Sequence, residues 1–388
     1  MRVDLEAVDD LASKPWADAV QALVDAAPSP ETAPAADKSD DTITWWTRQI
    51  TGSTSGLHER MTFFWHTVLT THRYASGDQK LLPAQLNMLR ANALGNFRQL
   101  LQGFVVDGAL IKYLNADTST GEKPNENLAR ELMELFSTGI GHYTEDDVRA
   151  GALALTGWRV DDNNNNAVYF DSERANSEPV TFLGETKNWD IVSVVDRLCD
   201  HPATAARISS LIWYHFVGTQ LDGQQAADLG AWWQQQNLEV KPLLTRVFDE
   251  EGFRANHYAR PRSGFEFFTA LQALANFDLS EHWRPRNLGQ ALYEPPNVAG
   301  WPTGDRWLDA DSMLRRSDML FSFDYGDIPG ALQAGVDEIL DRCGLFVVSQ
   351  STLDALNGAE AGRSSFGEEG VAQLRWRIAL SSPEFQLT

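Results

Sequence analysis

The chain has 388 residues, and 54 acidic against 32 basic residues give it a formal charge of −22. Proteins that bind nucleic acid through its phosphates carry the opposite balance, and an acidic surface is repelled by anionic membranes, so we expect neither partner. No segment approaches the roughly 20 apolar residues that cross a bilayer, and the acidic start does not resemble a signal peptide. We therefore expect no membrane insertion and a cytoplasmic location for the chain as given, or an exported, envelope-associated one if residues before Met1 are missing.

The first 41 residues predict a short helix followed by a connector. Residues 15–26 have helical spacing, and residues 28–41 are a polar, proline-rich stretch. From Thr42 onward, apolar residues recur every three or four positions with few interruptions, as in amphipathic helices. We predict residues 1–41 as a short N-terminal helix with its connector. Residues 42–388 are predicted as one large helical domain, with a subdivision near residues 160–190 as the alternative.

Helical spacing predicts most of the main body. The expected helices cover residues 57–72, 83–104, 125–138, 189–199, 203–217, 224–236, 239–249, 263–276, 309–319, 330–342 and 368–381. Thr144 opens a further helix with a capping box, because its hydroxyl caps the helix while the side chain of Asp147 reaches back. Gly157 ends that helix.

Residues 160–190 break the helical rhythm. Val168–Phe170 and Val180–Leu183 have the composition of short strands, and together they predict one small hairpin. The two cysteines, Cys199 and Cys343, share no zinc or disulfide spacing. The predicted fold class is therefore mainly α: a large, multi-helix, bundle-like domain with one small β-hairpin near residues 166–184.

A polar stripe follows the helix expected at 125–138. At about 100° per residue, polar side chains fill one arc and large apolar side chains fill the opposite one. The polar residues are Glu126, Asn127, Arg130, Glu131 and Glu134, with Asn125 immediately before them. One interpretation is a solvated face whose i,i+4 ion pairs each contribute about 0.2–0.5 kcal/mol. The other is a pocket in which the carboxylates share a cation or divide acid and base roles, while Arg130 holds them ionised or binds an anionic substrate group.

A second stripe, made of Glu59, Thr62 and His66, lies on an earlier helix. His66 is a candidate metal ligand or proton carrier, although a lone histidine on a helix is more often a simple hydrogen-bonded residue. If the two stripes face each other, Glu59, His66 and Glu134 would supply ligands for a divalent metal from two helices. The Glu-x-x-His spacing of such sites is missing, because Ser137 stands three residues after Glu134.

The segment from Glu294 to Pro302 predicts a rigid loop. Two prolines stiffen its start and one its end, and Gly300 permits an unusual backbone dihedral angle. Such a loop presents Asn297 and Trp301 to a ligand, or else Trp301 plugs a gap between helices; both interpretations remain open. The chain has no nucleophile elbow, phosphate loop, zinc-protease helix or dinucleotide motif.

Several of these segments recur together in one known family. In chain order they are Phe64–His66, Arg90–Leu101, Asn125–Leu135, Tyr143–Val148, Leu155–Trp158, Phe182–Gly184, Pro295–Pro302 and Ser382–Leu387. This set resembles the domain-of-unknown-function family eighteen hundred over roughly residues 42–388. The resemblance implies a bacterial, mainly helical protein and carries no established activity. Members are often exported and encoded beside a sulfatase-like family, which implies a cell-envelope role and a sulfatase-like partner.

Two regions depart from the family pattern. Many members have a histidine before the Phe-Leu-Gly strand, where this chain reads Asp171–Asn176 without one. If that histidine serves a metal site in relatives, this chain has lost or altered the site. The helix with which members usually begin is also shortened or missing here.

The sequence leaves two functions open. The first is a hydrolase or transferase with a polar pocket. Its predicted catalytic residues are Glu131, Glu134 and His66, its predicted substrate-binding residues are Asn125, Asn127, Arg130, Trp158, Asn297 and Trp301, and its candidate metal ligands are Glu59, His66 and Glu134. The second is a non-catalytic binding or scaffold protein of a cell-envelope or secretion pathway, which would use its 13 tryptophans and the loop at 294–307.

Overall fold

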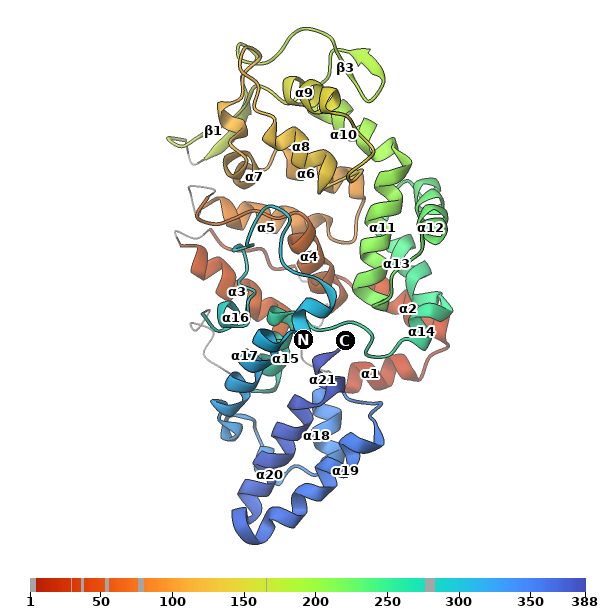
Figure 1. Ribbon diagram of the computed structural model, residues 1–388, viewed down its shortest axis with the longest axis vertical. Coiled ribbons are helices and arrows are strands. Elements are labelled where there is room, and N and C mark those ends of the chain that lie inside the picture. Colours follow the sequence, from red (N-terminus) through yellow and green to blue (C-terminus); the bar gives the residue numbers. More distant parts are fainter. Residues whose placement is uncertain are drawn as a thin grey trace.

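The computed structural model describes residues 5–28, 30–35, 38–52, 56–75, 80–164, 166–275 and 283–388. Within these ranges the chain forms 21 α-helices and four short strands, which confirms the predicted mainly α class (Figure 1). The helices up to the first strand are α1 (Leu5–Ala12), α2 (Trp16–Asp25), α3 (Ser39–Gly52), α4 (Gly56–Val68), α5 (Leu81–Asn92), α6 (Phe97–Val105), α7 (Gly108–Tyr113), α8 (Asn127–Glu134) and α9 (Glu145–Ala154).

The remaining helices follow the strands. They are α10 (Ile191–Asp200), α11 (Pro202–Val217), α12 (Gly223–Gln235), α13 (Val240–Asp249), α14 (Glu251–Ala255), α15 (Gly264–Leu274), α16 (Trp283–Asn287), α17 (Ala310–Phe321), α18 (Val336–Cys343), α19 (Gln350–Gly358), α20 (Arg363–Ser381) and α21 (Pro383–Gln386). Most match a predicted range to within a few residues. The helices that lie outside every predicted range are α1, α3, α7, α14, α16, α19 and α21.

Side-chain caps explain where several helices begin. Thr144 and Asp147 form the predicted capping box at the start of α9. The helix expected over residues 83–104 is divided into α5 and α6, because the side chain of Asn96 accepts hydrogen bonds from the backbone N–H groups of Arg98 and Gln99 and so starts a new helix.

The strands form two antiparallel pairs rather than the one predicted hairpin. Strand β1 (Trp158–Asp161) pairs with β2 (Ala167–Phe170), and β3 (Val180–Phe182) pairs with β4 (Glu185–Lys187). The prediction that residues 168–170 and 180–183 pair with each other is therefore wrong. Leu183 and Gly184, with φ values of 45° and 80°, make a two-residue turn that brings Glu185 opposite Phe182. Strand β3 therefore pairs with the segment that follows it, β4, and not with β2.

The buried apolar residues gather in two clusters. The first joins α2 and α6 to α13, and the second joins α3, α15 and α17 to α20. In Figure 1 the strands and α8–α10 lie at one end of an elongated molecule, and α18–α20 lie at the other. Helices α4 and α5 contribute to both clusters: on α4, Phe64 belongs to the first and Phe63 to the second.

The proline-rich segment after α2 is anchored to α5. The backbone N–H of Ala33 donates to Asn87 Oδ1 at 2.7 Å, and Asn87 Nδ2 donates back to the Ala33 carbonyl at 3.1 Å. Helix α2 itself buries Val20 and Val24 in the first cluster. The predicted connector therefore runs along the main body for part of its length.

Candidate functional site

Helix α8 turns its apolar arc inward, as the sequence predicts. Leu128, Ala129, Leu132 and Met133 are buried, because they face the first apolar cluster. The helix starts at an Asx turn, in which Asn125 Oδ1 accepts from the N–H of Asn127 at 3.0 Å. On the other arc, Asn127 is exposed, and the remaining polar side chains are half-buried. The predicted polar stripe thus lies along one edge of the molecule.

Arg130 is held between two carboxylates. Its two Nη atoms each donate to one oxygen of Glu145 at 2.8 Å, and one also donates to Glu126 at 3.1 Å. These hydrogen bonds raise the pKa of the Arg130 guanidinium, and the bonds that Arg130 donates to Glu145 have the largest effect. Because its donors are engaged, Arg130 ties α8 to α9, and it offers less to an anionic substrate than the sequence suggested.

Glu131 and Glu134 have different surroundings, although both are half-buried on the same helix. Glu134 Oε2 accepts a hydrogen bond from Tyr143 Oη at 3.0 Å. The carboxylate of Glu131 has no hydrogen bond or ion pair with any residue that the structure describes. Burial, and next the charge of Glu134, raise the pKa of Glu131. Tyr113, on α7, lies close enough that the charge of Glu131 adds to the effect of burial and raises the pKa of Tyr113.

His66 is enclosed by aromatic rings. It is fully buried, and its ring centroid lies 4.4 Å from that of Tyr293, 5.2 Å from Trp46 and 5.3 Å from Trp301. Its Nε2 accepts the backbone N–H of Tyr293 at 3.2 Å. Burial lowers the pKa of His66 to about 3, so the imidazole is neutral. A side chain so enclosed cannot exchange protons with a substrate in solution, which argues against the predicted role as proton carrier.

Glu59 forms an internal ion pair. Its Oε1 accepts from Arg90 Nε at 3.0 Å and from Nη2 at 2.5 Å, and its Oε2 accepts from Trp46 Nε1 at 3.0 Å. Burial alone would raise the pKa of Glu59, but hydrogen bonds from His58 and Arg90 outweigh burial and hold the pKa below its ordinary value. Glu59 is therefore committed to partners within the protein.

The three candidate metal ligands do not come together. Glu59 faces Arg90, His66 faces aromatic rings, and Glu134 accepts a hydrogen bond from Tyr143, which lies between α8 and α9. Across the described ranges, no three His, Cys, Asp or Glu side chains are placed to hold a metal ion. The two polar stripes thus do not face each other around a common centre.

The loop predicted at 294–302 packs against the end of α4. Thr70 Oγ1 donates to the Val298 carbonyl at 2.6 Å, and a Cβ on Gly300, where φ is 88°, would lie only 2.9 Å from the Thr67 carbonyl. Trp301 is 7% exposed and fills the space beside His66. Of the two interpretations of this residue, the structure therefore favours the one in which Trp301 plugs a gap between helices. Asn297 is exposed, and its Oδ1 accepts from the N–H of Ala299 at 2.9 Å, so its side chain shapes the turn.

Trp158 lies apart from these groups, on β1. It is half-buried, and its ring is 5.5 Å from that of Phe170, its partner on β2. On β2, Tyr169 and Phe170 are 46% and 52% exposed, so the paired strands present aromatic rings to solvent. The sequence singled out Trp158 through its motif and gave no sign of these neighbours.

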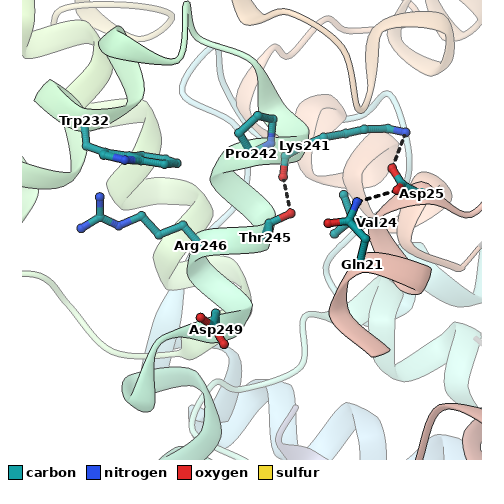
Figure 2. Close-up of a pocket in the computed structure, with 9 residues that line it drawn as sticks. All are labelled: Gln21, Val24, Asp25, Trp232, Lys241, Pro242, Thr245, Arg246 and Asp249. Carbon is teal, nitrogen blue, oxygen red and sulfur yellow. Dashed lines mark hydrogen bonds and ion pairs between the residues drawn. The ribbon is translucent and has the colours of Figure 1, made fainter. Parts of the chain in front are cut away.

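A shallow groove that the sequence did not predict lies between α2, α12 and α13 (Figure 2). It encloses about 500 Å³ and is lined by Gln21, Val24, Asp25, Trp232, Lys241, Pro242, Thr245, Arg246 and Asp249. The Arg246 guanidinium lies 4.6 Å from the centre of the Trp232 ring, and Lys241 pairs with Asp25 at 3.4 Å. Its residues come from distant parts of the chain, so no local pattern could have indicated it.

A family model described as "Protein of unknown function (DUF1800)" matches residues 4–387, nearly the whole chain, and the chain belongs to this family. The match confirms the resemblance seen in the sequence motifs. No curated protein and no solved structure matches the chain. Of the helices in the described ranges, none is long and apolar enough to cross a membrane.

Proposed function

We propose that this DUF1800 protein is an enzyme of the hydrolase or transferase class that uses Glu131 as its general acid. The observation that carries the proposal is the state of that carboxyl group, which is half-buried, lacks a hydrogen-bond partner among the described residues and has a raised pKa. Carboxyl groups with perturbed pKa values gather at active sites, and a raised pKa lets a carboxyl group hold its proton at a higher pH than an ordinary glutamate does.

Glu134 is the natural second group of such a site. It lies one helical turn after Glu131 and is oriented by Tyr143. In the proposed reaction, Glu131 gives its proton to the leaving group, while Glu134 takes a proton from a water molecule or an acceptor hydroxyl. Arg130 positions the helix through Glu145, and the exposed Asn127 is available to bind substrate. His66, Asn297 and Trp301 do not enter this proposal, because packing and turn contacts engage them.

The test combines a direct titration with an activity screen. We expect NMR to find a pKa above the ordinary glutamate value for Glu131. We expect Glu131→Gln to lower turnover of any active ester, phosphate or glycoside on a chromogenic panel by at least about 100-fold, the lower limit for a general acid. Glu126→Gln, which removes a carboxylate immediately before the same helix, is the matched control and should keep activity. An ordinary pKa for Glu131, or equal losses in both variants, contradicts the proposal.

A second candidate is a non-catalytic binding protein, and the groove in Figure 2 favours it. An aromatic ring beside groups of both charges is suited to a polar ligand with one apolar face, and ligand sites are concave surfaces of this kind. A cell-envelope or secretion role and a sulfatase-like partner belong to this alternative. It predicts that Trp232→Ala abolishes recovery of a co-expressed sulfatase-like partner, while Glu131→Gln leaves recovery unchanged. The reverse pattern contradicts it.

A further inference from the structure

Arginine side chains from three parts of the chain converge beside α4. Arg60 lies on α4, Arg260 and Arg262 lie in the segment that leads into α15, and Arg316 lies on α17. Arg260 engages the carboxylate of Glu266 through both Nη atoms at 2.9 and 2.5 Å, and the charge of Glu266 also acts on Arg262 and Arg316. Arg60 Nη2 is 3.8 Å from the same carboxylate. In the described part of the chain, the side chains of these arginines form no ion pair with another acidic side chain, so positive side chains outnumber negative ones here in a protein whose net charge is −22.

Part of this arginine cluster holds the end of the described chain. Arg262 Nε donates to the Leu387 carbonyl at 2.9 Å, and Arg316 Nη1 donates to Gln386 Oε1 at 2.9 Å. Residues 260 and 388 also exchange backbone hydrogen bonds. These contacts engage Arg260, Arg316 and Arg262 Nε. They do not involve Arg60 Nε or the two Nη atoms of Arg262.

The unused donors point to a ligand. Arg60 Nε is buried and has no hydrogen-bond partner among the described residues, although Arg60 Nη2 donates to Thr388 Oγ1 at 3.3 Å. Within the same ranges no hydrogen bond engages the two Nη atoms of Arg262, whose guanidinium lies 4.6 Å from the centre of the Phe385 ring. His215 is 9% exposed, and its buried Nε2 has no partner there either. Burial, and then the charges of Arg260 and Arg60, keep the pKa of His215 well below its ordinary value. The imidazole is therefore neutral and lies within reach of both charges.

The arginines also repel one another. Burial, together with the charges of Arg260 and Arg262, lowers the pKa of Arg60 to about 10, and only Glu266 opposes this. A buried charge without a counter-charge destabilises a fold, so an anion bound here would relieve the repulsion. The side chain of Arg60 is 28% exposed, which leaves access from solvent.

We propose that this arginine cluster binds a tetrahedral dianion, phosphate or sulfate, free or as a group on a larger molecule. Guanidinium groups match oxyanions because their N–H donors are fixed in a planar fork, and several of them around one centre suit a dianion better than a monocarboxylate. Glu266 orients Arg260, and the unpartnered donors of Arg60, Arg262 and His215 face the anion. This site is independent of the carboxylates on α8.

The test is calorimetric titration of the whole protein with inorganic phosphate, sulfate and acetate, at an ionic strength held constant with chloride so that general screening is the same in each titration. We expect saturable binding of the two dianions and at least tenfold weaker binding of acetate. Arg60→Gln should weaken dianion binding at least tenfold, and Arg60→Lys should weaken it less. The matched control is Arg98→Gln, which removes the same charge from a side chain of similar exposure, 25%, that is paired with Asp196 and Asp200.

Structural and binding outcomes separate the alternatives. A crystal soaked in selenate should show an anomalous peak beside Arg60. If neither dianion binds saturably, if acetate binds equally well, or if Arg98→Gln weakens binding as much as Arg60→Gln, the proposal is overturned. If Arg60→Gln fails to fold, the titration of the unaltered protein and the selenate peak decide the question alone.

Discussion

Helices α4 and α8 each carry a polar stripe, and the two stripes have opposite surroundings. On α4, Glu59 and His66 are fully buried, and their partners are an arginine and a set of aromatic rings. On α8, Glu131 and Glu134 remain half-exposed, and Glu131 has no partner among the described residues. The cause is position: both apolar clusters pack against α4, whereas α8 packs against one. A helical pattern therefore locates a polar stripe without telling whether protein or solvent faces it.

The largest expected effect comes from breaking the buried pair on α4. Glu59→Ala leaves Arg90, which is 5% exposed, without its counter-charge, and removing one partner of a buried pair typically lowers the free energy of unfolding by about 3–5 kcal/mol. Glu126→Ala, just before α8, removes a surface ion pair with Arg130 and should lower the free energy of unfolding by at most about 1 kcal/mol. Urea unfolding followed by circular dichroism measures both. Similar losses in the two variants would mean that the two stripes do not differ as described.

The next effect is the pH dependence that His66 contributes. Its pKa is about 3 in the folded protein and about 6.5 in an unfolded chain, so folding favours the neutral form. Its contribution to stability is complete above pH 6.5 and is lost as the pH falls from there toward 3, by about 1.4 kcal/mol per unit. We expect His66→Asn to be less stable at pH 7 and to lose less stability between pH 6 and pH 4 than the unaltered protein. Parallel curves would contradict the burial of His66.

The smallest expected effect is the pH dependence of stability that Glu131 on α8 contributes. It has the opposite sign to that of His66. The pKa of Glu131 is raised by folding, so its contribution is full below the ordinary glutamate pKa and is lost as the pH rises through the folded value. Glu131→Gln should therefore stabilise the protein at pH 7 by less than about 1 kcal/mol, because it replaces a half-buried carboxyl group beside the charge of Glu134 with a neutral amide. The gain should vanish near pH 4. A loss of stability at pH 7 would show that Glu131 has a structural role.

Much of the fold follows from local patterns. The buried arc of α8, the capping box at Thr144 and the helix that starts at Pro202 depend on neighbouring residues, and the sequence contains those directly. The pairing of the strands does not follow from local patterns, because β2 could have paired with the strand before it or with the strand after it. A positive φ at Leu183, an unusual angle for a leucine, decided the pairing of β3, and composition does not reveal it.

The candidate sites were harder to predict than the helices. The sequence singled out Glu131 and Glu134 as candidates, but the tyrosines beside them lie outside α8: Tyr113 is on α7, and Tyr143 precedes α9. From the sequence, Asn297 and Trp301 are candidates for binding a ligand. In the structure their loop instead packs against the end of α4, through contacts that only the folded chain reveals. Arg60 and Arg316 are 256 positions apart in the sequence, so no motif could have joined them.

The position of α4 between both apolar clusters also determines how the protein opens. A helix that packs against two clusters cannot separate from its neighbours while either cluster is intact. Its backbone amides should therefore exchange with solvent only when the whole molecule unfolds, whereas those of β1–β4 exchange by local opening.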